Sequence, residues 1–169
     1  MEQQNRALQK RKQRAFAKSF LRKYYMVDDI IAHYLSQLAG IEHLIEGVDE
    51  LKTRIEKPFY EALRGDMTER KQALTTIIQS LIRWKDAVDD CVMFDLTEVE
   101  NKVFLERYVQ CKLWKWILSD CFDEKYKLRV NSSIIEKVAI AMEQADEEAK
   151  KVQKTAAESS EAIDFLLKK

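Results

Sequence analysis

Glycine and proline are almost absent from this chain, which has 3 glycines and 1 proline in 169 residues. Sheet proteins of this size need many tight turns, and tight turns depend on glycine, proline and asparagine. Composition therefore excludes a β-sandwich, a β-barrel and a glycine-loop nucleotide fold. Hydrophobic residues make up 46% of the chain, which is enough to form a core. We expect an all-α protein.

Long apolar runs are also missing. The longest uncharged stretch that we find, Ile30 to Ile41, is well short of the ~20 apolar residues of a membrane helix, so we expect no membrane partner. The three cysteines, Cys91, Cys111 and Cys121, are odd in number and form no C-x-x-C pair. This pattern disfavours a disulfide framework or a zinc knuckle, and it favours a reducing, cytoplasmic location.

Charge is balanced overall but unevenly distributed. Residues 1–25 carry a net charge of +7, residues 26–100 carry −8, and residues 101–169 carry +1. The basic residues of the first segment are Arg6, Lys10, Arg11, Lys12, Arg14, Lys18, Arg22 and Lys23. Three interpretations stay open. The segment is a nucleic-acid arm that contacts phosphates, a helix that docks on the acidic middle of the same chain, or a localisation signal.

Apolar residues at helical spacing predict three helices in the first part of the chain. They cover about 5–25, 28–57 and 68–94, with a short loop or single turn over 59–67. Pro58 is expected to end the second helix, because the residue before proline is pushed out of the α region. Thr68 is expected to cap the third. Gly40 and Gly47 share a face of the second helix and indicate a close neighbouring helix or a kink.

Two capping boxes predict the remaining helices. Thr97 with Glu100 opens a fourth helix that reaches about residue 121, and Ser133 with Glu136 opens a fifth over 133–168. Residues 122–130 are expected to form a short extended or irregular connection. In the fifth helix, small and apolar residues recur in steps of three and four, as in a coiled coil. That seam either packs within the chain or pairs with a second copy in a homodimer.

The expected architecture is an all-α bundle of about five helices. We divide it into a basic N-terminal helix or arm, residues 1–25, and a helical bundle, residues 26–169. The long coiled-coil-like C-terminal helix, residues 133–168, belongs to the bundle.

The sequence contains few candidates for catalysis or metal binding. The two histidines, His33 and His43, are too far apart along a helix to share a metal. Three acidic pairs at helical spacing match the carboxylate pairs that hold Mg²⁺ in all-helical nucleotide hydrolases: Glu46 with Asp49, Asp86 with Asp89, and Glu143 with Asp146. Such pairs also arise by chance in an acidic chain, so a hydrolase is the third hypothesis. We predict no catalytic residue, metal or cofactor.

Two of the three tryptophans, Trp114 and Trp116, are two residues apart and cannot share a helix face. One can pack in the core while the other faces outward, or both can pack at a bundle end. An outward ring beside Lys112 and Lys115 suits a partner contact or a base-stacking platform.

The stretch Leu105-x-Arg107-Tyr108-Val109-x-x-Lys112-x-Trp114-x-x-Ile117 resembles the start of the DNA-binding half of Gram-positive phage late-gene transcription regulators of the ArpU and RinA kind. That half looks like the last region of a sigma factor. The resemblance implies a recognition helix that begins at Asn131, Ser132 and Ser133 and contains Lys137. The start of such a helix can bind phosphate. About 14 residues separate Ile117 from Ser132, a longer connection than the short turn of that family.

The first hypothesis is a small nucleic-acid-binding regulator of the phage or mobile-element type. It binds duplex DNA through the basic residues of the first segment. A second contact surface comprises Lys125, Lys127, Arg129, Asn131, Ser132, Ser133 and Lys137. The alternative is a helical interaction module, an adaptor or an inhibitor of host machinery, with no nucleic-acid role. It would bind a protein partner, or a second copy, through the C-terminal helix and exposed aromatic residues.

Overall fold

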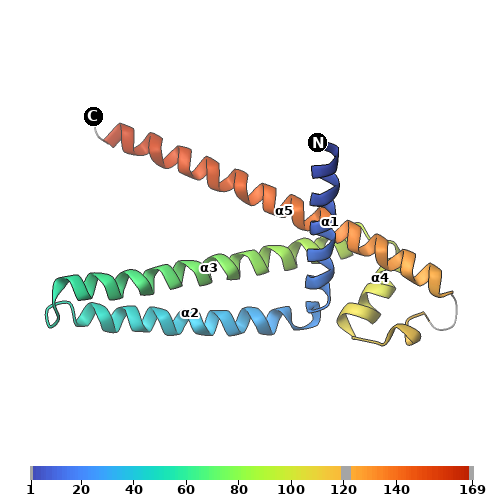
Figure 1. The fold of residues 1–169 in the computed structure, drawn as a ribbon, viewed down its shortest axis with the longest axis horizontal. Helices are drawn as coiled ribbons and strands as arrows, with labels where there is room; N and C mark the ends of the chain where they lie inside the picture. The colour runs from blue at the N-terminus through green and yellow to red at the C-terminus, as the bar shows by residue number, and fades with distance from the viewer. Residues whose placement is uncertain (1, 119–122, 168–169) are drawn as a thin grey trace. The chain divides into compact units, whose positions relative to one another are not determined.

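The computed structural model of the chain describes the backbone of residues 2–118 and 123–167, and the side chains of residues 4–118 and 123–154. The described part contains helices and no strand (Figure 1). Its α-helices are α1 (Glu2–Leu21), α2 (Val27–Glu50), α3 (Lys57–Phe94), α4 (Glu98–Phe104) and α5 (Glu124–Leu167). The predicted all-α class, with a long C-terminal helix, is confirmed.

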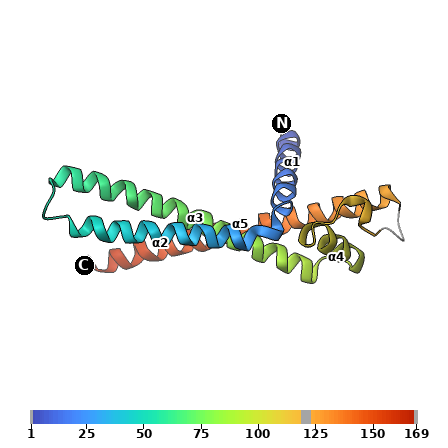
Figure 2. The ribbon, with the colours of Figure 1, turned by 90° about the horizontal axis from the view of Figure 1, so that it is seen from below.

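The chain divides into two compact units. Unit 1 comprises residues 1–25 and 83–169, and unit 2 comprises residues 26–82. Unit 1 thus contains α1, the end of α3, α4 and α5, whereas unit 2 contains α2 and the first part of α3. Within unit 2 these two helices run side by side as an antiparallel hairpin (Figures 1 and 2).

The hairpin is joined by one seam of half-buried side chains and by exposed ion pairs. Lys71 Nζ lies 2.8 Å from Glu42 Oε1. Near the hairpin turn, Asp49 accepts hydrogen bonds from Arg64 Nε at 2.8 Å and from the Tyr60 hydroxyl at 2.6 Å. The Arg64 and Tyr60 hydrogen bonds lower the pKa of Asp49. These contacts set the register between α2 and α3.

The turn of the hairpin differs from the sequence prediction. α2 ends at Glu50 rather than near residue 57, and α3 begins at Lys57, so residues 59–67 are helical and not a loop. Pro58 therefore starts a helix instead of ending one. Its missing N–H costs nothing in a first turn, where the N–H groups have no intrahelical partner. Thr68 caps nothing. It lies inside α3 and donates its hydroxyl to the Arg64 carbonyl at 2.8 Å.

The glycines of α2 do not mark a close helix contact. A Cβ added at Gly40 or Gly47 would meet no atom of the described residues within 4 Å. The expectation of a closely approaching neighbour at these positions is therefore wrong within the described part. None of the described helices combines the length and the apolar composition that a bilayer crossing requires.

Unit 1 contains a core built from several elements. Its most deeply buried side chains come from α1, α3, α4, α5 and the segment after α4: Leu21, Val88, Val103, Phe104, Ile117, Ile134 and Val138. α5 packs against both α1 and α4. The capping box of α4 is confirmed, since the Thr97 side chain accepts from Glu100 N while the Glu100 carboxylate accepts from Thr97 N.

The structure corrects the bounds of two helices that the sequence predicted in unit 1. The α-helix that begins after Thr97 ends at Phe104, continues as a π-helical turn over Leu105–Val109, and then turns away at Cys111. Residue 121, its expected end, lies outside the described residues. α5 begins at Glu124 rather than at 133, and Asp123 caps it by accepting from Tyr126 N at 2.6 Å. Described residues 123–130 are therefore helix or cap, and Ser133 lies in a helix interior.

Candidate nucleic-acid interface

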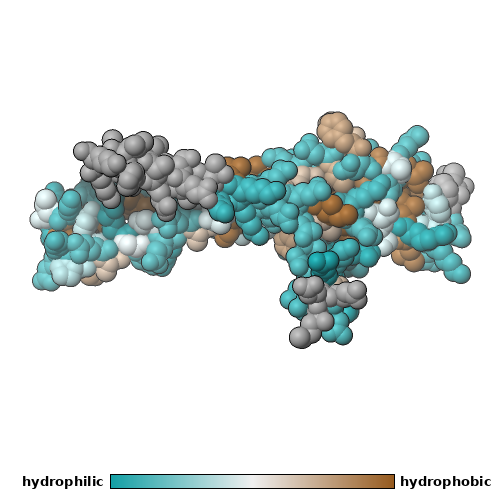
Figure 3. All heavy atoms as spheres, turned by 90° about the horizontal axis from the view of Figure 1, so that it is seen from above, coloured by the Kyte–Doolittle hydropathy of each residue, from teal (hydrophilic) through white to brown (hydrophobic). Residues whose placement is uncertain are grey.

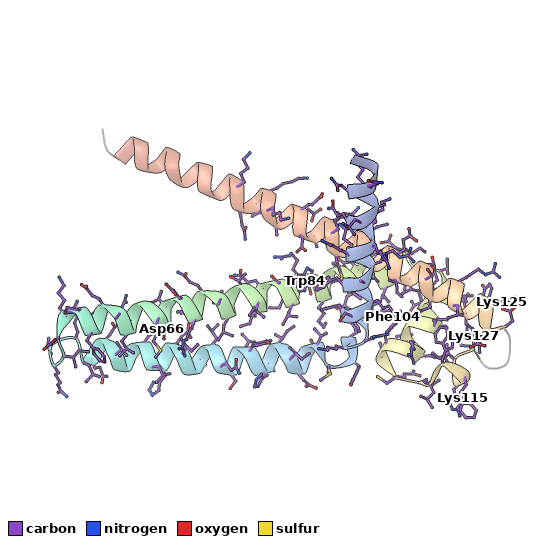
Figure 4. The ribbon with its side chains drawn as sticks, viewed as in Figure 1. Asp66, Trp84, Phe104, Lys115, Lys125 and Lys127 are labelled. Atoms are coloured by element: carbon purple, nitrogen blue, oxygen red, sulfur yellow. The ribbon has the colours of Figure 1, made fainter. Side chains whose placement is uncertain are left out.

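A row of aromatic rings holds the C-terminal half of α1 in unit 1. Trp84 of α3 meets the edges of Phe16 and Phe20, with ring centroids 4.9 and 6.2 Å apart. Tyr24, just after α1, lies 5.3 Å from Phe104, measured between ring centroids. Trp84 and Phe104, both labelled in Figure 4, are drawn on the two sides of this part of α1. The Tyr24 hydroxyl also donates to Asp89. Edge-to-face pairs of this kind each add about 0.5–1.5 kcal/mol beyond burial. α1 is therefore anchored by its last turns.

Polar contacts hold the middle of α1 where it crosses α5. The Gln13 amide donates to the Glu143 carboxylate, and Arg14 Nη2 donates to Ser132 Oγ at 2.7 Å. Arg14 also lies 4.0 Å from Glu136. Because every described residue before Gln13 is exposed, the first part of α1 extends beyond this crossing.

All eight basic residues of the first 25 are exposed. Within the described part of the chain, Arg14 is the one with an acidic partner. That partner, Glu136, belongs to α5 and not to the acidic middle of the chain. α1 packs through aromatic and small residues, while its cations face solvent. In the space-filling view, the projecting part of α1 is hydrophilic (Figure 3).

Five of these basic residues follow one another in steps of four: Arg6, Lys10, Arg14, Lys18 and Arg22. α1 is helical over the first four, and Arg22 N continues the helical hydrogen-bond pattern by donating to the Lys18 carbonyl at 3.3 Å. Residues four apart lie on adjacent turns, so these side chains form one ridge, which winds about 40° around the helix at each step because a turn holds 3.6 residues. At a rise of 1.5 Å per residue the ridge is about 24 Å long. We call these five residues the basic ridge.

The second predicted contact surface is divided by the structure. Lys125 and Arg129 are exposed on the first turns of α5, whereas Lys127 is buried. Asn131 accepts from the Tyr108 hydroxyl at 2.6 Å, and Ser132 accepts from Arg14. These residues lie inside α5, so the expected recognition-helix start, with its free N–H groups, is not formed at Ser133.

Lys137 belongs to a polar cluster that joins three elements of unit 1. Its Nζ lies 2.7 Å from Glu100 Oε2 and donates to the Asp95 carbonyl at 2.8 Å. Burial acts to raise the pKa of Glu100, but hydrogen bonds from Lys137, Ser133 and Thr97 outweigh it and lower this pKa to about 2. The cluster ties the end of α3 and the start of α4 to α5, which explains these residues without nucleic acid.

One carboxylate of each acidic pair considered for Mg²⁺ has another partner. Asp49 pairs with Arg64, and Asp89 pairs with Lys85 Nζ at 3.0 Å. Asp146 accepts from Arg83 Nη2 at 2.8 Å and from Trp84 Nε1 at 3.0 Å. In the part of the chain that the structure describes, no three His, Cys, Asp or Glu side chains gather into a potential metal site.

The segment after the π-helical turn is not the continuous helix that its apolar spacing predicts. Trp114 is half-buried beneath the Arg107 guanidinium, whose Cζ is 5.7 Å from the ring centroid. Trp116 is 60% exposed, and Lys115 Nζ lies 5.2 Å from its ring centroid. Of the two arrangements expected for this pair, the structure shows one ring turned inward and one outward. The adjacent lysines were the sequence signal for this site.

Comparison with protein-family models, curated proteins and solved structures found no match to this chain. The geometry of unit 1 is therefore the basis for a function.

Proposed function

We propose that the chain binds duplex DNA through the basic ridge and acts as a small cytoplasmic regulator of the phage or mobile-element type. The observation that carries the proposal is the exposure of all eight basic residues in the first 25, among which Arg14 alone has an acidic partner in the described part. Cations left unpaired at a surface are available to replace the counterions of a phosphate backbone. The regulatory role rests on the sequence resemblance of residues 105–117 to phage late-gene regulators alone, since the recognition-helix start that it implies is not formed at Ser133.

The length of the basic ridge suits one side of a duplex. A ridge of about 24 Å matches about seven base pairs at a rise of 3.4 Å per phosphate along each strand. Lys125 and Arg129 of α5 are exposed and join the proposed contacts. Phosphate contacts give affinity and position without sequence information. We therefore propose a binding mode in which affinity is mostly electrostatic.

A charge-neutralising double variant tests this proposal. Lys10→Gln with Lys18→Gln removes two ridge cations that have no acidic partner among the described residues. We expect the plot of log affinity against log salt for a duplex to become shallower by about 2, which is about one per lost phosphate contact. The matched control is Lys52→Gln with Arg54→Gln, two exposed cations at the turn of unit 2. Equal effects of the two double variants would contradict a specific role for the basic ridge.

A second candidate function is supported by the far part of α5. Val138 and Met142 of its apolar seam are buried in unit 1, whereas Val152, on the same seam, is 69% exposed. An apolar seam that continues past its intramolecular partners is typical of a helix that pairs with another protein or a second copy. Light scattering of the full chain and a Val152→Glu variant tests this alternative. A dimer that the variant dissociates would support it, and a monomer in both would remove the homodimer.

A further inference from the structure

The segment over residues 110–118 is a loop that contains one 3-10 turn, Trp114–Trp116, and is held at both ends. Glu106 is its central anchor, because its carboxylate accepts from Lys112 Nζ and from Leu118 N, both at 3.1 Å. Burial acts to raise the pKa of Glu106, and these hydrogen bonds outweigh it, so this carboxylate stays ionised. Arg107 Nη1 donates to the Lys112 carbonyl at 3.1 Å, and Ile117 is fully buried. The loop is therefore presented in a defined conformation.

The loop conformation carries backbone strain. Cys111 and Leu118, one at each end, have φ values of 54° and 46° without being glycine. A non-glycine residue in the left-handed region costs on the order of 1–3 kcal/mol, and such residues concentrate at functional sites. The surrounding hydrogen bonds and the burial of Ile117 offset this cost. The chain turns at these two residues, and the middle of the loop between them faces solvent.

The exposed side chains of the loop combine an aromatic ring with positive charge. Trp116 and Leu113 are 60% and 61% exposed. Residues 110–118 include Lys112 and Lys115 and no acidic residue, which gives the loop a net charge of +2. The Lys115 ammonium lies over the Trp116 ring, so one face of this exposed ring already attracts a cation.

More positive charge lies at the same end of unit 1 as this loop. Five residues, 119–123, connect Leu118 to the first residue of α5, Glu124, so the chain keeps these two ends within about 22 Å of each other. Lys115, Lys125 and Lys127 are drawn at the same end of unit 1 (Figure 4). Lys125 and Arg129 are exposed there, and Asp123 is engaged in capping α5. A ring beside several cations complements a nucleotide, which offers a base to stack and a phosphate to pair.

We propose that this loop binds single-stranded nucleic acid, with an unpaired base stacked on Trp116, an adjacent phosphate contacted by Lys115, and a phosphate further along the strand contacted by Lys125. The proposal rests on the proposed function and extends it, since duplex contacts by the basic ridge need no unpaired base. Stacking on an aromatic side chain tolerates any base, because every base has a π-face. The two surfaces together suit a nucleic acid that contains both a duplex and an unpaired segment.

The test is a fluorescence-polarisation titration with two labelled probes, a thymidine strand of about 12 nucleotides, within known single-strand site sizes, and a fully paired duplex. Trp116→Ala is expected to weaken single-strand binding by about 5- to 150-fold, the usual effect of losing one stacked base. Duplex affinity is expected to stay unchanged. Trp116→Phe, which keeps a ring, should retain most of the single-strand affinity. Phe59→Ala is the matched control, because Phe59 is 63% exposed in unit 2.

The outcomes separate the two proposals. If Trp116→Ala leaves single-strand affinity unchanged while the duplex still binds, the loop proposal is overturned and the proposed function stands. If neither probe binds at low salt, both are overturned. A third arm uses vesicles with anionic lipid. Vesicle binding that Trp116→Ala abolishes, with no effect on the strand, would make the loop a lipid contact and overturn nucleotide stacking.

Discussion

The two units of this chain are stabilised in different ways. In the described residues, unit 2 has Val27, Val48 and Ile78 as its buried apolar side chains, and all other buried apolar side chains lie in unit 1. Helices in proteins are stabilised more by tertiary packing of their apolar faces than by the helix propensity of their residues. Unit 1 has such packing, from four helices and a loop, whereas unit 2 has one seam. Buried apolar side chains are thus concentrated in unit 1, which also presents both proposed binding surfaces.

Polar contacts follow the same division. The ion pairs of unit 2, such as Lys71 with Glu42, join side chains that are 43% and 47% exposed, and exposed pairs contribute ~0–1 kcal/mol. In unit 1, Glu100 is 7% exposed at its side chain and meets Lys137 at 2.7 Å. Its partner Lys137 is 33% exposed, so the cost of breaking the pair lies mainly in leaving the buried Glu100 carboxylate without its cation. The comparison predicts a resilient unit 1 and a hairpin that opens readily.

The largest expected effect comes from removing a core ring in unit 1. Phe104→Ala should lower the free energy of unfolding by about 3–5 kcal/mol, because Phe104 is 2% exposed and its loss leaves a cavity. All three tryptophans lie in unit 1, so tryptophan fluorescence in a urea titration follows that unit. Ile78→Ala in the hairpin should reduce helical circular dichroism at low urea and leave the fluorescence midpoint in place. Equal shifts of that midpoint would show that the units unfold as one.

The second effect is a pH dependence set by Glu100. Its folded pKa of about 2 lies below the ordinary value of 4.5, so its contribution is fully present above pH 4.5 and is lost as pH falls towards 2. That contribution is on the order of 3 kcal/mol. Glu100→Gln should therefore destabilise unit 1 at neutral pH and flatten its loss of stability in acid. The control is Glu98→Gln, which changes an exposed carboxylate of the same helix. An acid profile of Glu100→Gln identical to that of the parent chain would count against the cluster.

The smallest expected effect is a gain. Gly40→Ala and Gly47→Ala should each stabilise α2 by ~1 kcal/mol, because alanine favours the helix and a Cβ meets open space at both positions. Slower amide hydrogen exchange along residues 27–50 is the measurement, with unit 1 unchanged. Faster exchange in the alanine variants would reveal a neighbour at these glycines.

Local chemistry made part of the fold predictable. The scarcity of glycine and proline led to the all-α class, and the Thr97–Glu100 capping box marked the start of α4. The same signals failed where context changed their meaning. Pro58 suits a first helical turn as well as a helix end, and Ser133 with Glu136 matches a capping box from within a helix. Capping requires non-helical backbone at the cap residue, and spacing alone does not determine it.

The candidate site was predictable where it depends on charge and unpredictable where it depends on backbone geometry. The charge count located the basic segment, because Lys and Arg side chains stay at the surface wherever the helix begins and ends. The sequence predicts a helix through residues 110–118, because Trp114 and Ile117 recur at helical spacing, but the structure has a loop there. Its turn depends on positive φ at Cys111 and Leu118 and on Glu106. Neither non-glycine residue signals a turn in the sequence.

The most direct test of the account is the affinity of the full chain for a duplex, measured across a salt series from about 50 to 200 mM. Four phosphate contacts, by the ridge cations other than Arg14, predict a slope of about −3.6 in log affinity against log salt, which is about a 150-fold loss over that range. A slope near this value would establish the ridge as a phosphate-binding surface. Absence of binding at the lowest salt, or an affinity that does not change with salt, would contradict the account.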